Sequence, residues 1–176
     1  MGSVRIRLAG REAGRGLISW SVRDLTSTEL DGLPTETSER PAAAGAPHPN
    51  GVISVDHVVA FTPNLDRTVR LLCDAGLDFR RLREEPTPAG APRQAFFRMG
   101  EAILEVIQVP DGSPMLEDPD GPARLWGISF LVENLGRSAD VLGDLLGEPH
   151  DAVQEGRRIA TVRREAGLGL AVALMD

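Results

Sequence analysis

Two stretches of the chain share one pattern of hydrophobic and polar positions. Residues 54–76 read SVDHVVAFTPNLDRTVRLLCDAG, and residues 125–147 read LWGISFLVENLGRSADVLGDLLG. In each stretch, an apolar run typical of a buried strand is followed by Asn64 or Asn134 and then by apolar residues at helical spacing. A supersecondary unit that recurs after about 70 residues indicates a fold built from two copies of that unit.

Both predicted helices have a start signal. Asparagine is a preferred N-cap residue, so Asn64 and Asn134 predict helices that begin at the residue after each of them. Gly76 is placed to end the first helix, because glycine readily adopts the left-handed conformation that follows many helix ends. The second helix is expected to extend from about residue 135 to residue 146.

Extended segments surround each predicted helix. In the first unit the strands are expected at residues 52–61, 77–85, 93–99 and 101–109. In the second unit they are expected at residues 125–132, 149–154, 158–164 and 168–175. The order βαβββ is therefore predicted twice, in module one (residues 52–110) and in module two (residues 124–176).

The amino-terminal part of the chain has a different pattern. Residues 4–8 and 17–22 alternate apolar and polar side chains on either side of a glycine-containing turn, which predicts a β-hairpin. Residues 26–51 lose this periodicity and become rich in Pro, Ala and Gly, which is typical of an extended linker. We therefore expect residues 1–50 to be a hairpin and linker that precede one domain, residues 51–176.

The predicted fold class is α+β: two paired βαβββ modules form curled mixed sheets around a cleft, with an N-terminal β-hairpin extension. Pairing the modules would bury sheet edges and enclose a cleft that neither module could enclose alone. An isolated hairpin is marginal in water, so Trp20 is expected to be buried where the hairpin meets a sheet edge or a partner subunit. Trp126 is expected in the core, facing the helices.

Composition narrows the function classes. No apolar run of about 18 residues and no secretory signal pattern occurs, which predicts a cytoplasmic protein with no membrane partner. The formal net charge is −7, and acidic residues lie among the arginines, so nucleic acid is not an expected partner. The single cysteine, Cys73, excludes an internal disulfide; it is interpreted as a small buried hydrophobe, with a reactive thiol as the alternative.

The doubled βαβββ pattern, in which VDHVVAFTPNLDRTV opens one half and GEAILEVIQVP closes it, resembles the vicinal-oxygen-chelate superfamily. That superfamily includes glyoxalases, extradiol dioxygenases, methylmalonyl-CoA epimerases and bleomycin-resistance proteins. The segments RQAFFRMGEAILEV and EGRRIATVRREAGLGLAVALM are similar to those of actinobacterial glyoxalase-like proteins. The resemblance covers residues 52–176 and implies the fold, whereas a fold alone does not define a reaction.

The resemblance also implies where a divalent metal would bind, because the superfamily uses a His or Gln on the first strand and a Glu on the last strand of each half. In module one these positions hold His57 and Glu105. In module two they hold Gly127 and Ala171, which have no ligand atoms to offer. Catalytic transition-metal sites commonly use three protein ligands, so we expect no tightly bound metal; a weakly held Mg²⁺ or Mn²⁺ stays open.

The faces of the predicted strands define a candidate ligand pocket. Its seven residues share a face with the His–Glu pair: Val59, Phe61, Ile103, Gly127, Ser129, Leu131 and Ala171. The small side chains at positions 127 and 171 would widen the pocket floor, or would let neighbouring strands approach closely.

These observations predict a glyoxalase-like protein that binds a small organic ligand in its cleft, with an incomplete metal site. One alternative is a divalent-metal-dependent lyase, isomerase or dioxygenase with His57 and Glu105 as catalytic residues. A metal-free His–Glu pair could also act as a general acid and base. Another alternative is a binding protein that confers resistance by sequestering an antibiotic. The sequence leaves a homodimer open.

Overall fold

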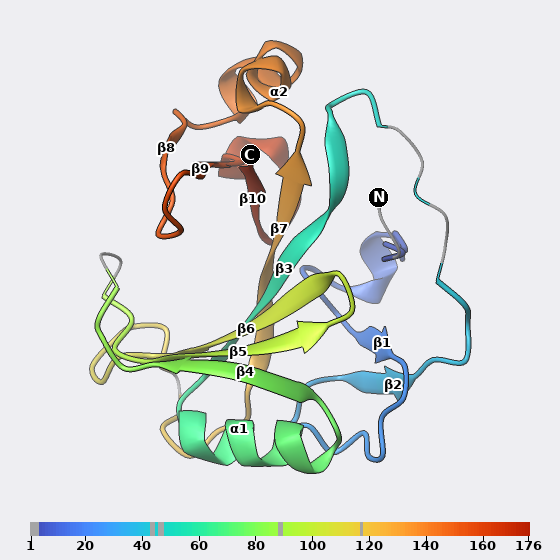
Figure 1. The fold of residues 1–176 in the computed structure, drawn as a ribbon, viewed down its shortest axis with the longest axis vertical. Helices are drawn as coiled ribbons and strands as arrows, with labels where there is room; N and C mark the ends of the chain where they lie inside the picture. The colour runs from blue at the N-terminus through green and yellow to red at the C-terminus, as the bar shows by residue number, and fades with distance from the viewer. Residues whose placement is uncertain (1–3, 43–44, 46–47, 88–89, 117) are drawn as a thin grey trace.

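The computed structural model describes the whole chain except residues 1–3, 43–44, 46–47, 88–89 and 117 (Figure 1). Eight strands form one sheet in the order β4-β5-β6-β3-β7-β10-β9-β8. Its centre is the antiparallel pair β3 (Val52–Thr62) and β7 (Arg124–Val132), which are the first strands of the two modules. The sheet is bent, with β4 to β6 in one arm and β8 to β10 in the other (Figure 1).

Module one follows the predicted order. After β3 come α1 (Leu65–Asp74), β4 (Asp78–Arg83), β5 (Gln94–Met99) and β6 (Ala102–Gln108). The predicted cap is confirmed, since the Asn64 side chain accepts a hydrogen bond from the Arg67 backbone N–H at 3.0 Å. The predicted stop is confirmed as well: Gly76 has φ of 93°, and its N–H donates to the Cys73 carbonyl.

Module two repeats the order with shorter elements. After β7 come α2 (Leu135–Leu142), a 3-10 turn (Gly143–Leu145), β8 (His150–Asp151), β9 (Arg158–Thr161) and β10 (Ala171–Met175). Asn134 caps α2 as predicted. The helix ends earlier than expected, because Gly143 takes φ of 54° and ψ of −133°, a conformation that side chains disfavour. The doubled βαβββ order and the α+β class are confirmed.

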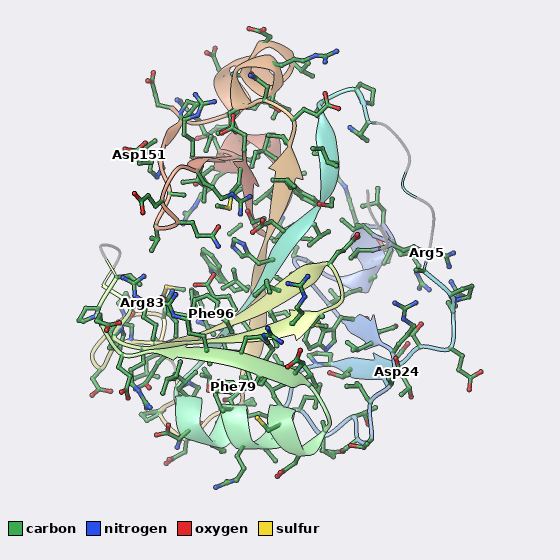
Figure 2. The ribbon with its side chains drawn as sticks, viewed as in Figure 1. Arg5, Asp24, Phe79, Arg83, Phe96 and Asp151 are labelled. Carbon is green, nitrogen blue, oxygen red and sulfur yellow. The ribbon has the colours of Figure 1, made fainter. Side chains whose placement is uncertain are left out.

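The helices cover the outer side of the sheet, and the core of module one lies beneath α1. Helix α1 packs against β4, β5 and β6, whereas α2 packs against β9 (Figure 1). Figure 2 shows Phe79 on the side of β4 that faces α1. Its ring packs edge-to-face on the ring of the buried Phe97, with the two ring centroids 5.4 Å apart. Among the described residues, no helix combines the length and apolar character that a membrane crossing requires.

The predicted N-terminal β-hairpin is wrong. Residues 4–10 form no strand, and β1 (Trp20–Val22) pairs in parallel with β2 (Thr35–Thr37), which lies in the segment expected to be a linker. The connection between them places Leu30 and Leu33 in the core of module one. Two strands with an alternating pattern are not stable by themselves, because they need a hydrophobic surface to pack against. Burial of the two leucines, by contrast, stabilises the observed arrangement of this segment by about 1.5–3 kcal/mol for each leucine.

Polar contacts hold the same connection against α1. Asp31 forms an ion pair with Arg67 at 2.8 Å and accepts a hydrogen bond from the Thr68 hydroxyl. Trp20 is half-buried, packs on the core of module one, and donates its indole N–H to Thr35 at 2.6 Å. The amino-terminal segment is thus part of the module-one core up to β2, and the linker prediction is wrong for residues 26–37.

Replacing Leu30 with alanine tests whether this segment stabilises the domain. Because Leu30 is fully buried, Leu30→Ala should lower the free energy of unfolding by about 2–5 kcal/mol. Urea denaturation followed by circular dichroism measures the change. The matched control is Leu8→Ala, since Leu8 is 92% exposed and its loss should alter stability by less than about 0.5 kcal/mol. Equal stability of the two variants would contradict the prediction.

Candidate functional site

Two adjacent residues of β3, Asp56 and His57, lie side by side because the strand is irregular at this point. Val55 pairs with Phe130 and His57 pairs with Ser129, so Asp56 is an extra residue without a partner on β7. Such a bulge breaks the alternation that sends neighbouring side chains to opposite faces. His57 Nδ1 and Asp56 Oδ2 consequently lie 2.7 Å apart, within hydrogen-bonding distance.

Strand β6 brings Glu105 next to His57, as the sequence predicts. The two strands are parallel, and Glu105 pairs with Val59, two residues beyond His57 on the same face. His57 Nε2 is 3.6 Å from Glu105 Oε2, and the two side chains are only 19% and 15% exposed. The imidazole is therefore held between two carboxyl groups, with Asp56 at one nitrogen and Glu105 near the other.

Glu105 lies in surroundings that favour its protonated form. Burial raises the pKa of Glu105 above its ordinary value, and the positive charges of His57 and Arg83 only partly oppose this shift. The buried side chain of Gln94, on β5, donates a hydrogen bond from Nε2 to Glu105 Oε1 at 2.5 Å; this contact by itself favours the ionised form, so the raised pKa is due to burial. Glu105 can thus keep a proton at a pH where an exposed carboxyl group has lost it.

Asp56 has the opposite tendency. Burial opposes its ionisation, but hydrogen bonds from His57 and from Arg157 outweigh burial and lower the pKa of Asp56. Arg157 lies between β8 and β9 and donates from Nη1 to Asp56 Oδ1 at 2.8 Å and to Gln154 Oε1 at 2.7 Å. An ionised Asp56 only accepts, so it keeps the His57 proton on Nδ1 and leaves Nε2 as the nitrogen that faces Glu105.

Three buried polar atoms around this network have no hydrogen-bond partner among the described residues: Gln94 Oε1, Ser129 Oγ and Arg157 Nη2. Ser129 lies directly opposite His57 on β7 and is 1% exposed. A buried polar group without a partner costs about 1–3 kcal/mol. Their concentration around one His–Glu pair indicates a place where water or a polar ligand completes the hydrogen bonds.

The residues present do not fit a tightly held transition metal. His57 Nε2 and Glu105 Oε2 are close enough to bind one cation together, but Gly127 and Ala171 supply no further donors. No group of three or more His, Cys, Asp or Glu residues that could hold a metal occurs in the part of the chain that the structure describes. Two strong donors fall short of the three protein ligands that such sites commonly use.

Gly127 has a packing role. A Cβ atom at this position would lie 2.9 Å from the Ala171 carbonyl oxygen and 3.1 Å from the Ala171 Cβ. Strands β7 and β10 pair in parallel with these two residues opposite each other. Of the two interpretations of the small residues, the structure supports close approach of the strands at Gly127.

Strand register places the predicted pocket residues on the face of His57. Ile103 pairs with His57, and Val59 pairs with both Gly127 and Glu105. The remaining predicted residues follow by alternation or pairing: Phe61, Ser129, Leu131 and Ala171. Figure 2 shows Phe96, which pairs with Glu105, on the side of β5 that faces the other arm of the sheet. Contact of these residues with a ligand stays a prediction.

The prediction that Trp126 lies in the core is wrong. Gly127 pairs with Val59 and Leu125 pairs with Ala60, so Trp126 is the extra residue of a second bulge. Its ring centroid lies 4.6 Å from that of Phe61, and the residue is 40% exposed. Trp126 therefore extends the apolar part of the predicted pocket beside Phe61.

The sequence did not predict three residues of the hydrogen-bond network around His57 and Glu105: Asp56, Gln94 and Arg157. Gln94 lies two residues before Phe96 and shares its face, but the sequence does not decide which face of that strand carries the site. Asp56 depends on a bulge and Arg157 on a loop, and neither leaves a periodic signal.

Other reactive side chains lie away from the site. Cys73 is exposed, so its interpretation as a buried hydrophobe is wrong. Partial burial and the charge of Asp74 raise the pKa of the Cys73 thiol, which makes it less reactive. His48 contacts Asn50, and His150 lies near a backbone carbonyl.

Comparison with known proteins identifies the class that this fold and site define. A family model described as the Glyoxalase/Bleomycin resistance protein/Dioxygenase superfamily matches residues 54–158. The chain belongs to this superfamily, which confirms the resemblance to the vicinal-oxygen-chelate superfamily; the likeness to actinobacterial glyoxalase-like proteins stays a prediction. A search of curated proteins found no match.

Solved structures agree with this assignment. Methylmalonyl-CoA epimerase from Mycobacterium tuberculosis is 16% identical over 71% of this chain and 88% of its own, with a TM-score of 0.58. A variant of the Streptomyces coelicolor methylmalonyl-CoA epimerase with 2-nitronate-propionyl-CoA is 20% identical over 70% and 96%, with a TM-score of 0.53. A hypothetical protein from Bacillus halodurans is 17% identical over 69% and 91%, with a TM-score of 0.55. At these identities the likeness shows the fold.

Replacing Glu105 with glutamine tests the raised pKa of this residue. A folded-state pKa above the unfolded one means that the folded protein binds the proton more tightly. Wild type should therefore lose stability relative to Glu105→Gln as pH rises from about 4.3 through the raised pKa, by about 1.4 kcal/mol for each pH unit that separates the two pKa values. Above the raised pKa the difference should stay constant.

Urea denaturation of both proteins across this pH range measures the difference in unfolding free energy. Glu148→Gln is the matched control, since it removes an exposed carboxyl group. A wild type that gains stability relative to Glu105→Gln as pH rises would contradict the prediction.

Proposed function

We propose that this protein binds a small organic ligand on the face that carries His57, and that His57 and Glu105 exchange a proton with that ligand. One observation carries the proposal: an imidazole oriented by Asp56 faces a buried carboxyl group at 3.6 Å, among buried polar atoms that have no partner in the described part of the chain. Such an arrangement supports acid–base chemistry without a resident metal.

The two groups can take complementary roles because their surroundings differ. His57 Nε2 is the available base, and the ionised Asp56 stabilises the imidazolium that forms when Nε2 takes up a proton. Glu105 is the available acid, because its raised pKa keeps it protonated to higher pH.

A carbon acid next to a carbonyl group is the simplest ligand for this pair. When its C–H bond breaks, the proton passes to His57 Nε2 and the electron pair moves onto the carbonyl oxygen, which accepts the proton of Glu105. In the reverse direction His57 returns a proton to carbon, the electron pair moves back from the oxygen, and the enol O–H proton returns to Glu105, which restores both residues. Methylmalonyl-CoA, which one similar structure holds, is a suitable probe because its C–H bond lies between two carbonyl groups.

Hydrogen–deuterium exchange tests the proposal. In D₂O, the protein should accelerate loss of the C2–H signal of methylmalonyl-CoA in proton NMR spectra. His57→Ala and Glu105→Gln should each slow this exchange by about 10²-fold, the usual contribution of a general acid or base. His150→Ala is the matched control, because His150 is exposed and lies outside the network.

An exchange rate that is the same in His57→Ala and in His150→Ala would contradict the acid–base role. Acetoacetate and oxaloacetate extend the test to smaller carbon acids. Binding of these probes without exchange would favour the second candidate function, which is non-catalytic sequestration of an organic molecule. One observation favours that candidate: Trp126, which is 40% exposed and packs on the buried Phe61, provides an apolar surface on the face that carries His57.

Elemental analysis tests the absence of a resident metal. Protein purified without chelator should contain much less than one Zn, Fe or Ni per chain, because module two supplies no ligand at positions 127 and 171. His57→Ala should contain the same background amount. A stoichiometric metal in wild type that disappears in His57→Ala would instead support the divalent-metal-dependent alternative.

A further inference from the structure

We infer that the ligand of this site is an organic anion and that Arg157, with Ser129, binds its carboxylate group. This inference rests on the proposed function, because it concerns the same site. It adds the chemical class of the ligand and assigns a task to module two, which supplies both residues.

One terminal nitrogen of the Arg157 guanidinium group holds the group in place, and the other is available to bind a ligand. Nη1 donates to Asp56 and to Gln154, which fixes the group beside the central strand. Nη2 is buried and has no hydrogen-bond partner within the described residues. Arginine presents its N–H groups as a rigid planar fork that matches carboxylate oxygens, so an oxygen anion is the natural partner for Nη2.

Ser129 supplies a second donor. Its hydroxyl is buried without a partner in the part of the chain that the structure describes, and β7 places it directly opposite His57. Residues opposite each other on neighbouring strands have Cβ atoms about 4.5–5.5 Å apart. A ligand that donates to or accepts from His57 therefore lies within reach of the Ser129 hydroxyl. Arg157 reaches the same place through Asp56, whose two carboxylate oxygens contact His57 and Arg157.

The charges around the site leave room for the negative charge of a bound anion. Arg157 Nη1 lies 2.8 Å from Asp56 Oδ1, so this ion pair compensates the charge of the Asp56 carboxylate. The positive charge of Arg83 acts on the other nearby carboxyl group, that of Glu105. A carboxylate that enters beside Arg157 thus meets the available donor Nη2, and the adjacent Asp56 carboxylate is already paired with the same arginine.

Gln94 indicates what the rest of the ligand offers. Its Nε2 is used by Glu105, and its Oε1 is buried on the module-one side of the site, with no partner among the described residues. That oxygen can only accept, so it suits a hydroxyl or an N–H group of the ligand. The network therefore presents donors from module two and an acceptor from module one.

The test compares two probes of the same shape, phenylacetate and phenylacetamide, near neutral pH. Binding is followed in ¹⁵N–¹H spectra through the indole N–H of Trp126 and the backbone N–H of Ser129. Wild type should bind phenylacetate with about tenfold lower Kd than phenylacetamide, the size expected for a charge-assisted hydrogen bond. Arg157→Gln should reduce this preference to within about twofold.

Two further variants separate recognition from folding. Arg163→Gln removes an exposed arginine of the same arm and should keep the full preference. Arg157→Lys keeps the positive charge but loses the planar fork, so it should keep part of the preference. Equal Kd values for the two probes in wild type, binding of neither probe, or an undiminished preference in Arg157→Gln would each overturn the anion site.

The proposed function fails in a different experiment, because neither probe reports on proton transfer. Acetone carries no charge, so exchange of its C–H protons depends on His57 and Glu105 without help from a carboxylate. Loss of the phenylacetate preference with intact acetone exchange would overturn the anion site alone. A phenylacetate preference without exchange of any carbon acid would keep the anion site and overturn proton transfer.

Discussion

The antiparallel pairing of β3 and β7 is the contact on which the rest of the structure depends. It joins the two modules along their first strands and sets His57 opposite Ser129. The register of this pairing shifts at three places, and two of these bulges lie at Asp56 on β3 and at Trp126 on β7. At each of these two bulges, a side chain that regular alternation would direct to the opposite face of the sheet lies on the face of the site. The β3–β7 pair therefore holds the modules together and also supplies the site with a carboxylate and an indole.

The two modules have the same element order but different chemistry. Module one carries the groups that titrate, His57 and Glu105, on neighbouring parallel strands. Module two carries Ser129 and Arg157, which do not replace the missing metal ligands. Each has a buried polar atom without a partner among the described residues, which favours hydrogen bonding with a polar molecule. The ion pair between Asp56 and Arg157 connects the halves, so the orientation of His57 depends on a loop of the other module.

Sequence patterns predicted the parts of this protein that depend on local rules. Asn64, Asn134 and Gly76 act within one helical turn, and strand alternation was enough to bring His57 and Glu105 to one face. Where the spacing of side chains changes by one residue, as at Trp126, alternation predicts the wrong face. Local rules do not predict long-range packing. Leu30 and Leu33 lie in a segment without periodicity, and they are buried in a core that α1 and strands β3, β5 and β6 form farther along the chain. Arg157 likewise reaches Asp56 from a loop, where no strand pattern limits the direction of a side chain.

The close contact between Gly127 and Ala171 bears on how the activities of such a fold can change over time. A histidine at position 127 would restore a donor in module two, but its Cβ would meet the Ala171 carbonyl oxygen at 2.9 Å. The backbone of β10 would have to move before the new side chain could serve as a ligand. Mutation of single residues thus meets a steric barrier on the way to a four-ligand metal centre, and metal-dependent chemistry is separated from the present site by a backbone rearrangement as well as by residue identity.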